Sequence, residues 1–455
     1  MATTLSWGLL GPGHIATQRR TRTLGVMASI RRFNDLAVPG LGGVWFGKQV
    51  VLATLGIYLA EESIAKGKRA TNIETANAVE ALACALAIPG LKGARDPRVR
   101  GTTMLPGRHD LSFQTVRQRG FYVTQPMRMG TVQALPALGL VSADSGRFNA
   151  FKCAQAGREL LDAAFHGISP FRRTVTEHLG RWAAGVPDTN ITTGAMKDAL
   201  SPMLALPSRA RVLLRERLLQ GGPNESSTDK ARRRDALTWV EALRARPDTA
   251  ISLHQRPTQI TEAEHWNDIR AGAFFTLARD AAIAALDAVE LHISNESSGQ
   301  TLSLDHALPP SVEQRLQVVA AAAERFLQER HYDREANEFC TECNGVNLTL
   351  VLQRLVARDG RVLCLKGREI RPGPAFRGGA QPINPDEADG PAVTAGEDSP
   401  AARGGIGWPP GISFRLQNLF FLSADLHDEL NRWLRADGLE PDEHTTRHEL
   451  TEEIA

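Results

Sequence analysis

Three of the five cysteines have a spacing that can hold a metal ion. Cys340 and Cys343 are separated by two residues, the spacing with which two thiolates bind one zinc ion from a tight turn. Twenty residues separate Cys343 from Cys364, which offers a third sulfur ligand, and either His331 or His427 offers a fourth ligand. Two interpretations stay open: the cluster holds one structural zinc ion, or the cysteines are reduced thiols and the protein has no cofactor.

A glycine-rich turn near the N-terminus points to a different chemistry. An apolar stretch beginning at Leu5 leads into Gly11-Pro-Gly13-His-Ile-Ala16. This pattern resembles the first turn of nicotinamide-dependent oxidoreductases, whose glycines let the backbone approach a pyrophosphate, and Asp35 stands at a suitable distance for the ribose-binding acid. However, residues 19–34 are basic, and no alternating strand and helix pattern follows. NAD(P) binding is therefore an alternative to a simple Gly-Pro turn in an N-terminal extension.

The sequence contains no motif that names a reaction. It has no phosphate-binding P-loop, no His-Glu-x-x-His and no Gly-x-Ser-x-Gly. His254, His265 and His292 are possible general bases, but each stands alone, and an isolated histidine more often fills a core or lies on the surface. The sequence favours a non-enzymatic protein and identifies no catalytic residue.

The charge is distributed unevenly along the 455 residues. The 53 Lys and Arg nearly balance the 51 Asp and Glu, which leaves a net charge of +2. Residues 1–150 nevertheless carry 18 basic and 8 acidic side chains, or +10, whereas residues 151–455 carry −8. A basic N-terminal third favours a domain that faces nucleic acid.

The apolar run 50–60 excludes a membrane span at its position. It has 11 residues, whereas a helix needs roughly 20 to cross a bilayer, so a buried helix is expected from Trp45 to Ser63. The N-terminus also lacks the apolar core of a secretion signal. We therefore expect a cytoplasmic protein with no membrane partner.

Helical signals dominate the chain and predict a mainly α, multidomain fold. Capping boxes, in which a hydroxyl and a Glu or Gln side chain satisfy each other's backbone N–H groups, are predicted at Thr71/Glu74, Thr261/Glu264 and Ser311/Gln314. The first box should begin a helix that ends near Ile88, before Pro89.

The segment 111–164 has the most specific pattern. A short helix is expected over Leu111–Arg119 and a second from Met127 to about Leu138. Two strands should then flank a turn at Ala143–Gly146, and a final helix should begin near Ala156. This order resembles the second half of a winged helix-turn-helix domain, with 71–88 as its first helix. In that family the second helix of the motif reads DNA, and the strand pair forms the wing.

The resemblance implies double-stranded DNA as a partner, because a helix fits the major groove while a cationic wing lies on the adjacent backbone. The side chains placed near base edges are Gln125, Arg128, Thr131 and Gln133. Those placed near phosphates are Arg117, Arg119, Arg147 and Lys152, with Arg95, Arg98, Arg100 and Arg108 widening the footprint. Pro136 is expected to kink or shorten the base-reading helix, and Cys153 stands where the family often has Thr.

The sequence leaves more than one function open. The leading hypothesis is a non-enzymatic DNA-binding or complex-scaffolding protein of bacterial type, for which an accessory role in a defence or mobile-element system is a guess about context. The first alternative is a winged helix that docks another protein subunit, with its apolar residues simply filling its core: Leu135, Leu138, Leu140, Val141, Phe148, Phe151, Leu160 and Leu161. The second is the NAD(P)-dependent oxidoreductase.

Five segments are expected along the chain. They are a helical N-terminal extension (1–70), the winged-helix domain (71–170), a helical domain (171–335), a small α+β domain with the Cys-x-x-Cys pair and a disordered or irregular insertion at about 372–410 (336–435), and an acidic tail (436–455).

Overall fold

Helices account for most of the described chain, which confirms the expected mainly α fold class. The computed structural model describes residues 22, 24–187, 189–295, 301–376 and 406–434. The glycine-rich turn at Gly11 and Gly13, most of the insertion expected at 372–410, and the acidic tail lie outside the described residues. None of the helices in the described ranges is both long and apolar enough to cross a bilayer.

The chain forms two units, and each combines segments that are distant in sequence. Unit 1 comprises Met1–Gly43, Leu218–Glu397 and Gly407–Leu419, and unit 2 comprises Val44–Arg217, Asp398–Ile406 and Phe420–Ala455. The predicted winged-helix segment 71–170 lies inside unit 2, whereas the predicted helical domain 171–335 is divided between the two units.

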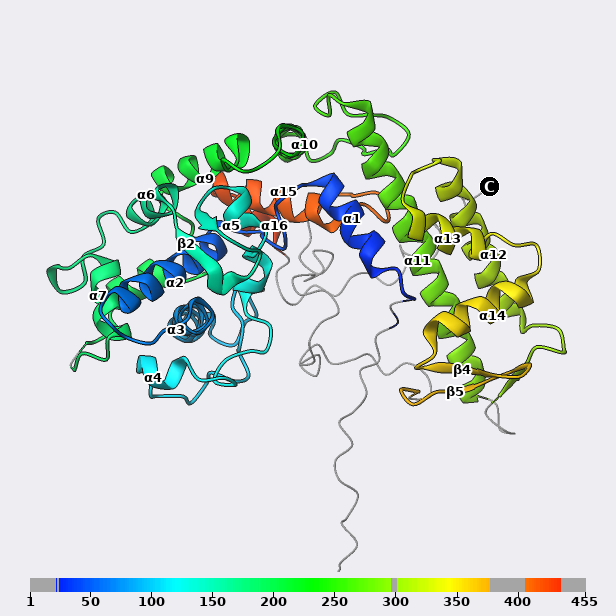
Figure 1. The fold of residues 1–455 in the computed structure, drawn as a ribbon, viewed down its shortest axis with the longest axis horizontal. Coiled ribbons are helices and arrows are strands. Elements are labelled where there is room, and N and C mark those ends of the chain that lie inside the picture. The colour runs from blue at the N-terminus through cyan, green and yellow to red at the C-terminus, as the bar shows by residue number, and fades with distance from the viewer. Residues whose placement is uncertain (1–21, 23, 188, 296–300, 377–405, 435–455) are drawn as a thin grey trace, which may run out of the picture. The chain divides into compact units, whose positions relative to one another are not determined.

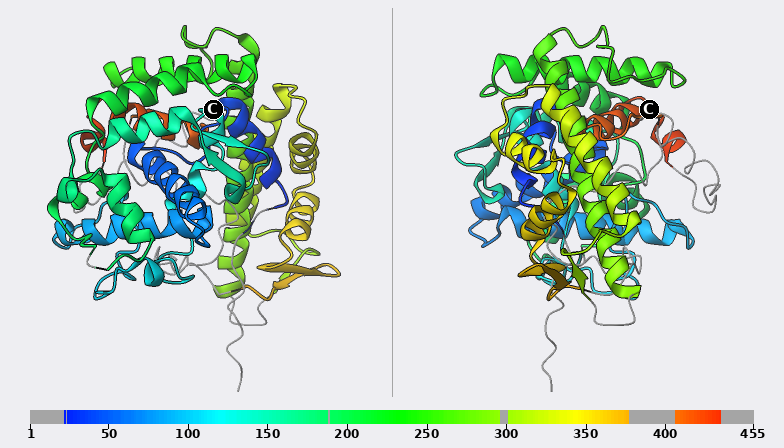
Figure 2. Two further views of the ribbon diagram at one scale, coloured as in Figure 1. Left: turned by 60° about the vertical axis from the view of Figure 1, so that its left-hand side comes forward. Right: turned by 90° about the vertical axis from the view of Figure 1, so that its right-hand side faces the viewer.

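Unit 1 is built around the long helix α11 (Ala263–Asn295), against which α1 (Met27–Ala37), α12 (Pro310–Gln328), α13 (Arg334–Cys343) and α14 (Leu348–Asp359) pack (Figures 1 and 2). An aromatic cluster joins α11 to α1, α12 and α13: the ring centre of Phe275 lies 5.5 Å from that of Phe33, 5.4 Å from that of Phe326 and 5.9 Å from that of Phe339. The remaining elements of unit 1 are α10 (Ser227–Ala245), β3 (Leu302–Ser303), β4 (Leu363–Lys366) and β5 (Glu369–Pro372), the strands forming an antiparallel sheet in the order β3-β5-β4.

Unit 2 is built around two packed helices, α2 (Gly47–Ala65) and α3 (Asn72–Leu91). Its other elements are α4 (Phe113–Val116), η1 (Met127–Thr131), α5 (Ala134–Ala137), β1 (Val141–Ala143), η2 (Phe148–Ala150), β2 (Phe151–Cys153), α6 (Gln155–Ala164), η3 (Pro170–Arg172), α7 (Val175–Ala183), α8 (Gly194–Leu200) and α16 (Leu430–Trp433), where η denotes a 3₁₀ helix. Along the chain, the boundary between the units falls within α9 (Ser208–Gln220) and α15 (Phe414–Leu426).

The contact between α2 and α3 depends on a glycine. A Cβ atom on Gly56 would lie 2.4 Å from the Cα of Ala76, so the two backbones approach more closely than any side chain allows. Almost all of the predicted apolar run 50–60 is buried within α2, which confirms it as a buried helix. The close crossing fixes the position of α3, on which the following elements pack.

The predicted capping boxes have different outcomes. The box at Thr71 and Glu74 is confirmed, and α3 continues to Leu91, a little past its expected end. The box at Thr261 is wrong, because α11 begins two residues later and the Thr261 hydroxyl donates instead to the Asp235 carboxylate, 2.5 Å away. The box at Ser311 is wrong as well, because α12 begins at Pro310 and has no side-chain cap. At Thr261 a distant carboxylate takes the hydroxyl, whereas at Ser311 the helix begins too early for the serine to be its cap.

Candidate nucleic-acid interface

The strands β1 and β2 form the hairpin expected at 141–153. They pair antiparallel, with Val141 opposite Cys153, Ser142 opposite Lys152 and Ala143 opposite Phe151. Val141 and Cys153 are buried, whereas Ser142 and Lys152 are exposed on the opposite face. The turn that connects the strands is also exposed and includes Arg147. Since alternate residues face opposite sides of a strand pair, the hairpin has one core face and one solvent face with cationic residues.

The N-terminus of α3 holds this hairpin in place. The side-chain amide of Asn72 donates to the carbonyls of Phe148, at 2.9 Å, and Phe151, at 2.7 Å. The Asn149 side-chain oxygen accepts a bond from the backbone N–H of Ile73 at 2.9 Å, which satisfies a donor in the first turn of α3. Three hydrogen bonds thus connect the first turn of α3 to η2, between the two strands, and to the first residue of β2.

The helix expected from Met127 to about Leu138 is not continuous. It is divided into η1 and α5, and α5 contains Pro136, in agreement with the expected shortening. The start of η1 is held by Glu80 of α3, which is 2 % exposed. Its two carboxylate oxygens accept the backbone N–H groups of Met127 at 2.5 Å and Arg128 at 3.0 Å. Burial raises the pKa of the Glu80 carboxyl, while these hydrogen bonds oppose that shift.

The side chains expected at base edges lie in different environments. Thr131 is fully buried, and its hydroxyl donates to the Arg128 carbonyl at 2.8 Å, so it presents no surface to a ligand. The Arg128 guanidinium donates to the Asn77 side chain and lies 5.3 Å from the centre of the Phe148 ring. Burial lowers the pKa of Arg128. Gln125 is half-buried, and Gln133 is exposed.

The side chains expected at phosphates also differ in how exposed they are. Arg117 is half-buried, 3.4 Å from Glu74 and 5.6 Å from the centre of the Phe113 ring. Arg119 and Arg147 are exposed and form no ion pair in the described part of the chain. Lys152 is exposed and lies 4.0 Å from Asp144, at the outer limit of an ion pair.

The basic segment before α4 contributes less surface than expected. Arg98 is buried, and its guanidinium donates to Asp96 at 2.6 Å and to Asn431 at 2.8 Å. Arg100 donates to the Gln125 carbonyl. Arg95 is exposed, and Arg108 is exposed with its guanidinium 4.8 Å from the centre of the Phe121 ring. The expectation that Arg98 widens the footprint is therefore wrong, because its charge is balanced inside the unit.

Several residues that shape this interface were not identified from sequence. Asn72 and Asn149 position the hairpin, and Asn77 and Glu80 anchor η1. Asn72 is the first residue of α3, and nothing in the local sequence there indicates its distant partners. The one available signal was a Glu at position 80 in an otherwise apolar stretch of α3, since a buried carboxylate needs partners.

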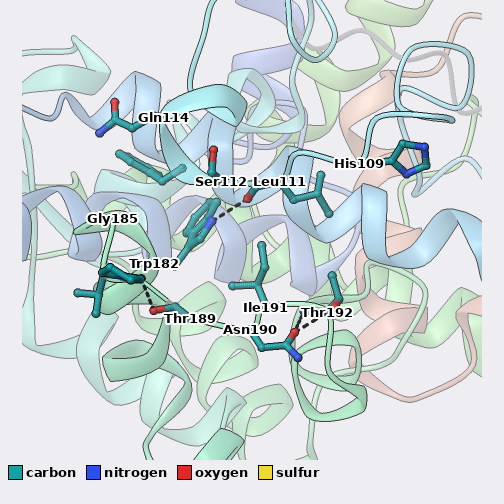
Figure 3. A pocket seen from close by; sticks show the side chains of 13 residues that line it. His109, Leu111, Ser112, Gln114, Trp182, Gly185, Thr189, Asn190, Ile191 and Thr192 are labelled. Carbon is teal, nitrogen blue, oxygen red and sulfur yellow. Dashed lines mark hydrogen bonds between the residues drawn. The ribbon is translucent and has the colours of Figure 1, made fainter.

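A pocket of about 660 Å³ lies beside α4 and α7 (Figure 3). Phe113 and Trp182 form its aromatic wall, with ring centres 5.1 Å apart and nearly perpendicular planes. The Trp182 indole N–H donates to the Leu111 carbonyl at 2.8 Å, and the Ser112 hydroxyl donates to Thr115 at 3.1 Å. His109 lies apart from Ser112, at the other side of the pocket. Among the lining residues that the structure describes there is no Asp, Glu, Lys or Arg, and the polar groups that line the pocket include the side chains of Gln114, Asn190 and Thr192.

The three cysteines of the predicted metal site, Cys340, Cys343 and Cys364, lie in unit 1. Cys340 and Cys343 are buried on α13, and burial raises the pKa of both thiols, that of Cys343 to about 12. Cys364 lies on β4, and its thiol donates to the Gly360 carbonyl at 3.4 Å. His331 is bonded through Nε2 to Asp268 at 3.0 Å and through Nδ1 to a backbone N–H. Within the described ranges, no group of three or more His, Cys, Asp or Glu side chains is placed to hold a metal ion, and the zinc ion stays a prediction.

Of the three isolated histidines, His265 has the most defined environment. It is fully buried, its Nε2 lies 3.0 Å from the Ala37 carbonyl, and burial lowers its pKa. These properties are those of a core histidine that stays neutral. His254 is exposed, and His292 lies in the last turn of α11.

No family model, no curated protein and no solved structure matches the chain. The candidate interface is defined by its own residues: Arg147 and Lys152 on the hairpin, and the exposed Arg119 and Gln133 on the segments that precede it.

Proposed function

We propose that residues 71–170 form a winged-helix module that binds double-stranded DNA through the phosphate backbone. One observation carries the proposal: a two-stranded hairpin, held by the first turn of α3, exposes Arg147 in its turn and Lys152 on its solvent face. A short cationic ribbon of this kind fits along a duplex backbone, where it neutralises phosphates.

The order of elements supports the winged-helix assignment. The helices α3 and α4, the divided segment η1 and α5, the hairpin β1–β2 and the helix α6 follow one another as helices, wing and final helix do in that family. The apolar residues expected in its core are all buried: Leu135, Leu138, Leu140, Val141, Phe148, Phe151, Leu160 and Leu161.

The charge of the surrounding segment also supports a polyanionic partner. Residues 44–217, the long segment of unit 2, contain 23 Lys and Arg and 13 Asp and Glu, a net charge of +10. The net charge of the whole chain is +2, so the positive charge is concentrated in this segment. A net positive field raises the rate at which a protein meets DNA and favours non-specific binding to it.

The same geometry argues against reading of the base sequence. A base contact needs a side chain that is free to enter the groove, but Arg128 is held by Asn77 and Phe148, and Thr131 is buried. The shortened α5 offers only four residues in place of a full recognition helix. We therefore propose binding that depends little on sequence and strongly on salt.

The experiment is a fluorescence anisotropy titration of a labelled duplex of about 20 base pairs, two helical turns, with the full chain at low salt. Arg147→Gln/Lys152→Gln should weaken binding, and duplexes of unrelated sequence should compete equally. The matched control is Lys197→Gln/Arg209→Gln, which removes two exposed positive charges elsewhere in unit 2.

Three results would contradict the proposal. Absence of duplex binding at low salt would exclude it outright. Equal weakening by the two double variants would show that only the net charge matters, and strong preference for one duplex sequence would show that bases are read after all.

A further inference from the structure

An exposed aromatic side chain stands on a strained segment of unit 2. Phe171 is 57 % exposed and has a backbone φ of +50°, and the next residue, Arg172, has a φ of +60°. Consecutive left-handed conformations are unfavourable for residues other than Gly, and they persist only where the surrounding structure imposes them. This segment therefore holds an apolar ring outward at a cost in free energy.

The ring has a firm support on one side. Phe171 stacks on the imidazole of His178 in α7, with ring centres 5.6 Å apart and planes 25° from parallel. His178 is itself 2 % exposed, and its Nε2 lies 2.8 Å from the Asn190 carbonyl. One face of the Phe171 ring is thus backed by a fixed side chain, while more than half of the residue remains accessible.

A pocket of about 460 Å³ is lined by Arg173, two residues after Phe171, and by Arg181 on α7. Arg181 forms no ion pair in the described part of the chain. The third cation, Lys66, pairs with Glu62 at 3.4 Å, and the Glu177 carboxylate accepts the Thr174 backbone N–H at 2.9 Å.

The exposed ring and the pocket both border α7, because His178 supports the Phe171 ring and Arg181 lines the pocket. Arg181 follows His178 by three residues, which places the two side chains about 60° apart around the helix axis. The described lining carries three cations and two acids, a net charge of +1, and the two acids are engaged with Lys66 and with the cap of α7.

We propose that this site binds an unpaired nucleotide of single-stranded DNA or RNA, with the base stacked on Phe171 and its phosphate bound by Arg173 and Arg181. A stacking ring beside guanidinium groups is the combination that binds single strands without reading their sequence. The proposal rests on the proposed function in one respect: it extends the nucleic-acid surface of unit 2 from a duplex to an adjacent unpaired strand.

The test uses the full chain and two labelled probes, a thymidine oligonucleotide of about 20 residues and a blunt duplex of the same length. Phe171→Ala should weaken binding of the single strand by roughly 5- to 150-fold and leave binding of the blunt duplex unchanged. Phe171→Tyr should keep the wild-type affinity, since a phenol ring stacks as well. The control is Val212→Ala, another exposed apolar residue of unit 2 at 52 % exposure.

A second variant distinguishes loss of base stacking from loss of protein stability as the cause of weaker single-strand binding. Phe171→Gly removes the left-handed strain, so its melting temperature should not fall below that of Phe171→Ala, yet its affinity for the single strand should be equally low. Arg181→Gln should reduce the salt dependence of single-strand binding by about 0.7 in the slope of log K against log salt, the contribution of one phosphate.

The outcomes distinguish the two proposals. Unchanged single-strand affinity in Phe171→Ala, or the same loss in Val212→Ala, would overturn this site whatever the hairpin does. If Phe171→Ala weakens the single strand but Arg147→Gln/Lys152→Gln leaves the duplex affinity unchanged, the single-strand site stands and the wing proposal fails.

Discussion

The salt dependence of DNA binding provides a quantitative test of the hairpin. Each phosphate neutralised on a B-form duplex contributes about 0.9 to the slope of log K against log salt, because a counterion is released. Arg147 is exposed and unpaired in the described part of the chain. The Lys152 side chain is 71 % exposed, and its amino group lies 4.0 Å from the largely exposed Asp144 carboxylate. Such an exposed ion pair is weak, so Lys152 can bind a phosphate instead.

Removal of both positive charges should therefore reduce the slope by about 1.8. When salt is raised from about 50 to about 200 mM, the affinity of the wild type should therefore fall by a factor about 12 times larger than the affinity of Arg147→Gln/Lys152→Gln. The assay is an anisotropy titration with the blunt duplex at a series of salt concentrations. Affinities extrapolated to high salt should converge, since the non-electrostatic part of binding is unchanged.

Arg128 provides a control for the hairpin variant, because its positive charge is held inside the unit. Its guanidinium is held by Asn77 and lies over Phe148, so Arg128→Ala should lower the melting temperature and leave the slope unchanged. The reasoning would be refuted by an unchanged slope in the hairpin variant, or by an Arg128→Ala variant that loses slope without losing stability. The latter result would mean that Arg128 leaves its internal contacts and meets a phosphate.

Three further predictions concern stability, measured by urea denaturation. Gly56→Ala should destabilise the fold by about 1–3 kcal/mol despite the better helix propensity of Ala, because the new Cβ would overlap Ala76. Glu80 holds its proton more tightly in the folded than in the unfolded state, so stability should fall as pH rises from the ordinary pKa of 4.5 through the raised value, and Glu80→Gln should remove this dependence. Arg233 of α10 is fully buried, and its guanidinium donates to both carboxylate oxygens of Glu225. Arg233→Ala should lower the free energy of unfolding by about 3–5 kcal/mol, because it leaves that carboxylate buried without its partner.

Each of these predictions has a contrary result. A Gly56→Ala protein as stable as the wild type would show that α2 and α3 are not in backbone contact. A pH dependence that survives Glu80→Gln would belong to other groups. Arg233→Lys should not rescue the alanine variant, because a lysine cannot bond both Glu225 oxygens in the paired geometry of a guanidinium, and full rescue would contradict the bidentate contact.

Features set by neighbouring residues were predictable from sequence. The box at Thr71 and Glu74 needs only groups within three residues of each other, and it forms as expected. The hairpin at 141–153 follows from two short apolar strands around a polar turn, and the burial of the run 50–60 follows from its composition alone. The capping box and the strand pairing are contacts within about a dozen residues, whereas the partners that bury the run 50–60 and hold the hairpin are distant in sequence and were not predicted.

The candidate site was only partly predictable because its side chains are sorted by distant partners. Arg128 and Arg147 look equally available in the sequence, yet Arg128 is bound by Asn77, 51 residues away, while Arg147 is left in solvent. Glu80 anchors the start of η1 from 47 residues away by accepting the backbone N–H groups of Met127 and Arg128.

The sequence by itself thus determined a mainly helical fold, a cationic hairpin and the concentration of positive charge around it. Only the tertiary structure decided which of those cations are balanced inside the molecule and which face solvent. The physical reason is that a buried charge must be paired, and the partner that pairs it is selected by packing rather than by position along the chain.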